Sequence, residues 1–149
     1  MTQTAEYEIT RLFDVPRLRV FQAWTEPEHF SSWFGPRGLT TPVDRVVMDV
    51  RPGGRWQATL CGEEEFEVTL DGAYREVAEP ARLVFTTGDP DHPGDGPASV
   101  ATVELTEAGG LTTMRFHQWG VNTDQEHADQ ARQGWIEFFD RLDEHLTSA

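Results

Sequence analysis

The chain has 149 residues, of which 38% are hydrophobic and 11% aromatic, so it can form one domain with a sizeable core. Its formal net charge of −14 argues against nucleic acids and anionic membranes as partners, because binding either one needs a basic surface. No apolar run is long enough to span a membrane, and the polar first residues lack the core of a signal peptide. We therefore expect one cytoplasmic domain over residues 1–149, without an internal disulfide because Cys61 is the only cysteine.

A strand and two short helices are expected first. Residues 6–15 alternate apolar and polar side chains, which is typical of a strand, and Pro16 ends the pattern. An amphipathic segment then runs to about Thr25, and a second one begins at Pro27 and ends at Gly35. Helices this short are not stable alone, so their aromatic side chains must pack against another part of the fold.

Further strands are expected between residues 43 and 119. Apolar residues recur there at every second position, and turns rich in Gly and Pro interrupt the pattern at short intervals. Gly72 is expected to cause a β-bulge in the third of these strands. The pattern predicts an antiparallel meander with strands at 43–50, 56–61, 66–77, 83–87, 100–105 and 111–119.

Residues 124–146 have the pattern of one long amphipathic helix. Apolar residues recur at steps of three and four, and charged residues occupy the opposite face. At ~1.5 Å per residue this helix is roughly 35 Å long, enough to cross a small domain. Phe138 and Phe139 lie about 100° apart on it, so we expect one in the core and the other facing a cavity, with Phe138 the more central.

The segment 88–97 consists only of Gly, Pro, Asp and His. It cannot bury apolar surface, which predicts a solvated loop at one end of the sheet. As an alternative, Asp89, Asp91, His92 and Asp95 could bind a metal ion. The spacing of a calcium-binding loop and its closing Glu are absent, so we expect a solvated loop and no metal site.

This order of elements predicts an α+β helix-grip fold. A curved antiparallel sheet of about seven strands would wrap around the long C-terminal helix, with the two short helices after the first strand. Several motifs in register resemble those of small proteins similar to the C-terminal domain of the activator of heat-shock-protein-90 ATPase, within the START-like (SRPBCC) superfamily. The matching segments are 13–17, 20–29, 33–38, 49–56, 72–77, 82–86, 134–135 and 140–142.

The resemblance implies more than one activity, because similar proteins carry lipids or polyketides, cyclise aromatic rings, sequester toxins or act as co-chaperones. Our first hypothesis is a module that binds a small hydrophobic or aromatic molecule in a cavity between the sheet and the C-terminal helix. The alternatives are a cyclase-like or hydratase-like enzyme acting on a polyketide-like substrate, and a co-chaperone-type protein-interaction domain. Binding is favoured over catalysis, no cofactor is expected, and a homodimer is compatible with the sequence.

The cavity of the first hypothesis would be lined mainly by aromatic rings, with few polar groups to orient a ligand. The residues expected to line it are Trp33, Trp56, Phe66, Phe85, Met114, Phe116, Trp135, Phe138 and Phe139.

An enzyme would need an acid or a base inside the cavity, because the motifs of serine hydrolases and phosphate-binding loops are absent. The candidates are Arg11, His29 and His117. His117 is opposite in parity to Phe116, so we expect it on the outer face of the sheet unless a bulge turns it inward. Arg11 has the parity of Ile9, which predicts either a charged group at the edge of the cavity or a slip of the register at the end of the strand.

Overall fold

The computed structural model of the protein describes residues 4–88, 97–121 and 125–147. The hypothesis of a metal-binding loop therefore lies outside the described residues. The strands are β1 (Thr4–Phe13), β2 (Val46–Met48), β3 (Arg55–Cys61), β4 (Glu67–Ala78), β5 (Arg82–Gly88), β6 (Pro97–Ala108) and β7 (Leu111–Val121). The helices are α1 (Arg17–Thr25), α2 (Pro27–Trp33) and α3 (Gln125–Thr147), with the 3₁₀ turns η1 (Val43–Arg45) and η2 (Glu63–Glu65).

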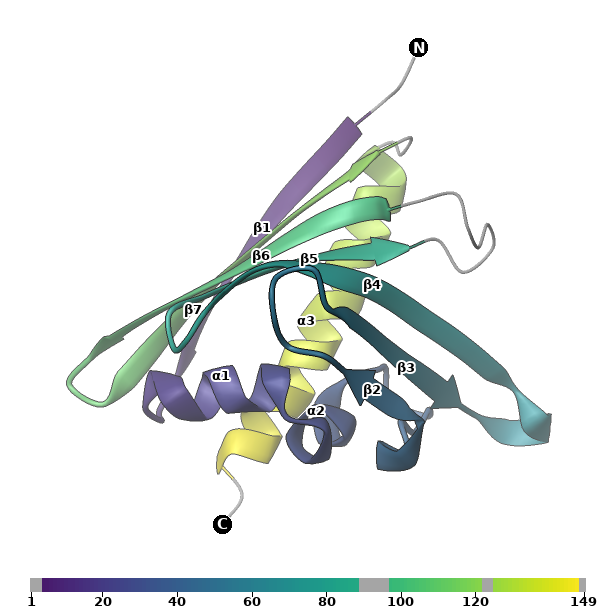
Figure 1. Cartoon of the computed structure of the whole chain (residues 1–149), viewed down its shortest axis with the longest axis horizontal. Coiled ribbons are helices and arrows are strands. Elements are labelled where there is room, and N and C mark those ends of the chain that lie inside the picture. Colours follow the sequence, from purple (N-terminus) through teal and green to yellow (C-terminus); the bar gives the residue numbers. More distant parts are fainter. Residues whose placement is uncertain (1–3, 89–96, 122–124, 148–149) are drawn as a thin grey trace.

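The strands form one antiparallel sheet of seven strands in the order β1-β7-β6-β5-β4-β3-β2. Strands β2 to β7 each pair with the next strand along the chain, which confirms the predicted meander, and β1 joins it beside β7. Figure 1 shows the sheet curving above α1 and α2, with α3 running obliquely behind the strands. The fold is thus the predicted α+β arrangement with a long C-terminal helix. No helix in the described part of the chain is long and apolar enough to cross a membrane.

The alternation along β1 and β7 directs one set of side chains toward the helices. Ile9 and Phe13 are buried, whereas the residues on either side of Ile9 are exposed. The register pairs Ile9 with Phe116 and Arg11 with Met114, so all five of these side chains belong to the inner face. That face is mainly apolar, and its polar side chains include Arg11 and the buried Thr112 and Gln118.

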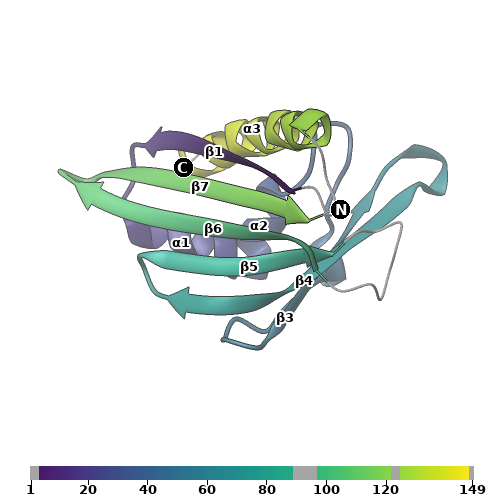
Figure 2. The ribbon, with the colours of Figure 1, turned by 90° about the horizontal axis from the view of Figure 1, so that it is seen from above.

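Helix α3 lies along the inner face beside β1, as Figure 2 shows from above. Phe139 and Leu142 are fully buried, whereas Phe138 is only half-buried. The expectation that Phe138 is the more central of the two phenylalanines is wrong. The helix turns Phe139 toward Phe116, with ring centroids 5.2 Å apart, and leaves Phe138 beside Phe34 at 5.5 Å.

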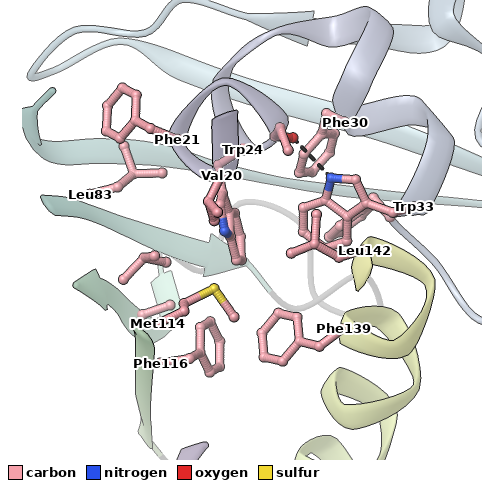
Figure 3. Packing of buried hydrophobic residues seen from close by; sticks show 14 of the residues in the cluster. Val20, Phe21, Trp24, Phe30, Trp33, Leu83, Met114, Phe116, Phe139 and Leu142 are labelled. Carbon is pink, nitrogen blue, oxygen red and sulfur yellow. Dashed lines mark hydrogen bonds between the residues drawn. The ribbon is translucent and has the colours of Figure 1, made fainter. Parts of the chain in front are cut away.

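Helices α1 and α2 cover the part of the inner face that α3 leaves open (Figure 2). Their tryptophans meet: the Trp24 and Trp33 rings lie 4.8 Å apart, edge to face. The Trp33 Nε1–H donates a hydrogen bond to the Ala23 carbonyl at 2.9 Å, drawn as the dashed line in Figure 3. The aromatic side chains of the two short helices therefore lie in the shared core, as their shortness predicted.

The hairpin between β3 and β4 departs from the sequence prediction. Its turn η2 places Glu64 and Glu65 at φ values of 55° and 62°, so β4 begins at Glu67 rather than at residue 66. Phe66 is consequently 52% exposed. The expectation that Phe66 faces the interior is wrong, because period-two alternation does not extend through this turn.

Candidate functional site

A small cavity remains in the core between helices α1 and α2 and strands β2 to β5. It measures about 10 Å³, close to the minimum that holds one water molecule. Protein interiors are otherwise closely packed, so such a gap marks a place where side chains do not fully meet. The lining residues are Trp24, Phe30, Phe34, Met48, Trp56, Tyr74, Leu83 and Phe85.

The rings around the cavity contact one another mostly edge to face. Trp56 stands nearly perpendicular to Phe85 and to Phe34, with centroids 5.9 Å apart in both pairs. Phe30 stacks on Phe34 at 4.4 Å, and Trp24 lies 5.7 Å from Phe85. Aromatic pairs of this kind contribute roughly 0.5 to 1.5 kcal/mol each beyond area burial. The cavity is therefore walled by ring surfaces that suit a small apolar or aromatic molecule.

A close approach between strands holds Trp56 in this wall. The Trp56 Nε1–H donates to the Thr86 carbonyl oxygen at 3.0 Å. A Cβ atom added at Gly72 would lie 1.7 Å from that oxygen and 2.6 Å from Trp56 Nε1. Only glycine leaves room for this contact. The register shift in β4 falls between Tyr74 and Glu76, slightly beyond the position predicted for the bulge.

Two residues that line the cavity each have a buried polar atom without a hydrogen-bond partner, Trp24 through Nε1 and Tyr74 through its hydroxyl. Their side chains are only 2% and 3% exposed. The other buried tryptophans of the described chain all donate to an oxygen: Trp33 to a carbonyl at 2.9 Å, Trp56 to a carbonyl at 3.0 Å, and Trp135 to a side-chain amide at 3.0 Å. The unpaired donors thus occur together at the cavity.

Both groups can donate a hydrogen bond to a molecule in the cavity. An indole N–H donates only. Burial raises the pKa of the Tyr74 hydroxyl above its usual range, and the negative charge of Asp49 acts in the same direction. Tyr74 therefore keeps its proton. A buried donor without a partner costs about 1 to 3 kcal/mol, so a partner here would stabilise the protein.

Met48 is the lining residue that comes from the edge of the sheet. It is half-buried, whereas the other lining residues are buried. It belongs to β2, a strand of three residues that pairs only with β3. The methionine side chain is unbranched and flexible, so it adopts several shapes at low cost. Met48 is the lining residue best placed to move.

The structure separates the nine predicted lining residues into three groups. Trp56 and Phe85 line the cavity. Phe66 lies on the surface, outside it. The remaining six pack in the core between α3, α2 and β7 rather than around the cavity, and these are Trp33, Met114, Phe116, Trp135, Phe138 and Phe139. Figure 3 shows Met114, Phe116, Trp33 and Phe139 converging there.

A hydrogen-bond network also occupies the interface of α3 with the sheet. The buried Gln118 accepts through Oε1 from Trp135 Nε1 at 3.0 Å and from the Tyr7 hydroxyl, and its Nε2 donates to Ser99 Oγ at 2.6 Å. Burial raises the pKa of Tyr7, so its hydroxyl stays protonated. These polar groups are paired with one another, in contrast to those at the cavity.

The three predicted polar candidates lie outside the cavity. Arg11 has the expected inward parity, but its guanidinium pairs with Asp140 of α3 at 2.8 Å. His117 lies on the outer face, as its parity predicted, with Nε2 3.1 Å from a carboxylate oxygen of Glu6. His29 Nδ1 lies 3.0 Å from Nε2 of His145, where α2 meets the end of α3. The structure does not bring these groups together.

Acid is expected to destabilise the protein through His145. Burial, and next His29 and Arg19, lower the pKa of His145 in the folded state. The unfolded chain, with a histidine pKa of about 6.5, takes up this proton first, so stability falls as the pH drops below about 6.5. Urea unfolding at about pH 7.5 and about pH 5 should therefore show a smaller acid loss for His145→Gln than for the wild type. Equal acid losses in His145→Gln and in the wild type would contradict this account.

The family of this protein follows from its similarity to known sequences. The model of the family described as "Activator of Hsp90 ATPase homolog 1-like protein" matches residues 14–147, nearly the whole chain. The chain belongs to this AHSA1-like family. The resemblance seen in the sequence motifs is thereby confirmed, together with the START-like superfamily to which they pointed. No protein of curated function matches the sequence.

Solved structures share the AHSA1-like fold over almost their full length. A protein from Chromobacterium violaceum is 20% identical, with a TM-score of 0.81 over 97% of this chain and 98% of its own. An AHSA1 protein from Silicibacter pomeroyi is 23% identical, with a TM-score of 0.77 over 95% and 97%. A protein from Mycobacterium smegmatis is 25% identical, with a TM-score of 0.74 over 95% and 90%. At these identities the likeness establishes the fold.

Sequence reasoning missed six lining residues of this AHSA1-like chain: Trp24, Phe30, Phe34, Met48, Tyr74 and Leu83. Three of them come from α1, α2 and the residue that follows α2. The signal for these three was present, since helices too short to be stable must bury their aromatic side chains. Met48, Tyr74 and Leu83 have only the alternation of ordinary strands, which does not distinguish a cavity from a filled core.

Proposed function

We infer that the protein binds a small apolar or aromatic molecule in the cavity beneath α1 and α2. The observation that carries this inference is the ring lining of a gap in an otherwise closely packed core. Membership of the AHSA1-like family supports it, because ligand-binding cavities are common in this fold family. This cavity does not lie at α3, where the sequence predicted one. At α3 the aromatic rings pack against one another, and the polar groups of the Gln118 network are hydrogen-bonded to each other.

Binding requires the wall of the cavity to move. A volume of about 10 Å³ does not hold a molecule larger than water. Rotation of Met48 away from Trp56 would open the cavity at the short edge strand β2, which has a neighbour on one side only. A ligand then shifts the population toward the open arrangement, by as much as it binds the open arrangement more tightly than the closed one.

Carriage or sequestration agrees better with this lining than a reaction does. Among the described residues that line the cavity, none carries an acid or a base that titrates near neutral pH, because Tyr74 keeps its proton. Acid–base catalysis on a bound ligand needs such a group within hydrogen-bond reach. Two of the candidates from the sequence, Arg11 and His29, lie outside the lining and contact Asp140 and His145.

Titration with α-methylstyrene tests the proposal, because this hydrocarbon has one aromatic ring and no hydrogen-bonding group. Isothermal titration calorimetry is expected to show saturable binding of about one molecule per chain, with a negative heat-capacity change from apolar burial. Heats that do not saturate, in a protein shown to be folded, would overturn the proposal.

Met48→Trp is expected to block the cavity. The larger side chain would occupy the opening, so the affinity for α-methylstyrene should fall about tenfold or more, equivalent to roughly 1.4 kcal/mol. The matched control is Val47→Trp, since the Val47 side chain is 61% exposed and points to the other face of the same strand. Calorimetry on both variants checks the prediction. Equal affinities would mean that the ligand does not pass or touch Met48.

A further inference from the structure

The unpaired polar atoms of the cavity specify more than an apolar ligand. Trp24 of α1 and Tyr74 of β4 line the same gap, and neither the Trp24 Nε1–H nor the Tyr74 hydroxyl has a partner. A buried polar group in a folded protein is nearly always hydrogen-bonded, so each exception calls for a physical reason. Both exceptions belong to residues of one cavity, whereas the other buried tryptophans of the described chain, Trp33, Trp56 and Trp135, all donate. This points to a partner that the cavity receives.

A hydrogen-bond acceptor is the group that both atoms can bind. The indole N–H has no lone pair to offer, and the phenol hydroxyl can donate its hydrogen. Other donors in the wall are already used: the Trp56 Nε1–H is bound to the Thr86 carbonyl. The remaining lining is aromatic or aliphatic, apart from the thioether of Met48. A ligand here must therefore accept hydrogen bonds at one end and be apolar elsewhere.

A water molecule fits this site less well than a carbonyl oxygen does. A water that accepts from Trp24 Nε1 still has two hydrogens of its own to donate. Among the lining side chains, only the Tyr74 oxygen offers a strong acceptor for them. A carbonyl oxygen accepts two hydrogen bonds and has nothing to donate, so it leaves no new group unsatisfied.

The ligand should also be neutral. No cationic side chain lines the cavity, and the charge that acts on the Tyr74 hydroxyl is the negative one of Asp49. An anion without a cationic partner is expensive to bury in an apolar site. A carboxylate or phosphate is thus disfavoured relative to a ketone, an aldehyde, an ester or a quinone.

We propose that the cavity takes a neutral aromatic or alicyclic carbonyl compound, whose oxygen accepts hydrogen bonds from Trp24 Nε1 and the Tyr74 hydroxyl. This proposal rests on the function inferred above, and it adds the chemical class of the ligand. Trp24 and Tyr74 act as the specificity-determining residues, while the surrounding rings contribute apolar contact.

Two probes of equal size separate this proposal from the function on which it rests. Acetophenone and α-methylstyrene share the same skeleton and differ in one position, where the first has a carbonyl oxygen and the second a methylene group. Calorimetric affinities are measured for both probes on the wild type and on Tyr74→Phe. The loss of one hydrogen bond corresponds to about a 2- to 10-fold change in affinity.

Tyr74→Phe is expected to weaken acetophenone binding about 2- to 10-fold and to leave α-methylstyrene binding unchanged. The ligand-free variant should be at least as stable as the wild type, because the hydroxyl that it loses has no partner. Tyr7→Phe is the matched control, since its buried hydroxyl is bonded to Gln118 outside the cavity. That variant should lose stability but keep its affinity for acetophenone.

The outcomes distinguish the two proposals. If both probes bind but Tyr74→Phe changes neither affinity, the carbonyl proposal is overturned and the binding function stands. If neither probe binds to the folded wild type, both are overturned. A second readout needs no variant: the indole N–H proton of Trp24 should move downfield in the NMR spectrum with acetophenone and not with α-methylstyrene. The same response to both probes would overturn the carbonyl proposal.

Discussion

Phe139→Ala is expected to lower the free energy of unfolding by about 3 to 5 kcal/mol, a large share of the roughly 5 to 15 kcal/mol that stabilises a domain. The reason is complete burial: Phe139 is 0% exposed and packs among four aromatic rings, of which Trp33 is the farthest at 6.3 Å. Its centroid is 5.2 Å from Phe116, 5.6 Å from Trp135 and 6.0 Å from Trp24. Because these residues belong to three different elements, the void cannot close by a small shift.

Phe138→Ala is the control for this prediction. Phe138 is the adjacent residue of α3, but it is only half-buried and contacts the Phe34 and Trp135 rings from one side. We expect its truncation to cost distinctly less. Urea unfolding of both variants, extrapolated to water, makes the comparison. Equal losses in the two variants would show that the helix packs equally tightly on both sides.

Gly72→Ala is expected to have the second large effect. The added Cβ would lie 1.7 Å from the Thr86 carbonyl oxygen, and real Cβ atoms do not come so close, so β4 or β5 must shift. We expect a loss of roughly 3 kcal/mol, at the upper end for overpacking, and weaker ligand binding because Trp56 loses its position in the cavity wall.

Gly134→Ala is the control for Gly72→Ala, because we expect it to raise the stability of the protein. Gly134 lies inside α3, and an added Cβ would meet nothing within 4 Å. Alanine in place of glycine within a helix should raise stability by about 0.5 to 1 kcal/mol. Thermal and urea unfolding of the two variants can be compared directly. A Gly72→Ala protein as stable as the wild type would contradict the close approach of the strands.

The fold was predictable from the sequence because its elements follow simple periods. The step of three and four residues in α3 and the alternation along β7 each identify one type of element, and Gly and Pro mark the turns. The position of β1 beside β7 was not predictable, since pairing between distant strands has no local signal.

The position of the cavity depends on features that the spacing of apolar residues along the sequence does not reveal. The path of α1 and α2 decides that Trp24 enters the wall, and the contact of Gly72 with Thr86 decides the position of Trp56. Phe66 was misplaced because two residues of positive φ end the alternation before it. An adjacent pair such as Phe138 and Phe139 was also ambiguous, because a helical wheel gives the angle between two side chains and not the direction of the sheet.

The central claim is that a small apolar molecule binds beneath α1 and α2, and its most direct test follows the indole signals of protein with ¹⁵N-labelled tryptophan during titration with acetophenone. Trp24 and Trp56 line the cavity, whereas Trp119 has the outward parity of β7. We predict that the Trp24 and Trp56 signals shift and saturate at about one equivalent while the Trp119 signal stays in place. The largest shift at Trp135, with Trp56 unmoved, would place the ligand at α3 and contradict the claim, as would a spectrum that acetophenone leaves unchanged.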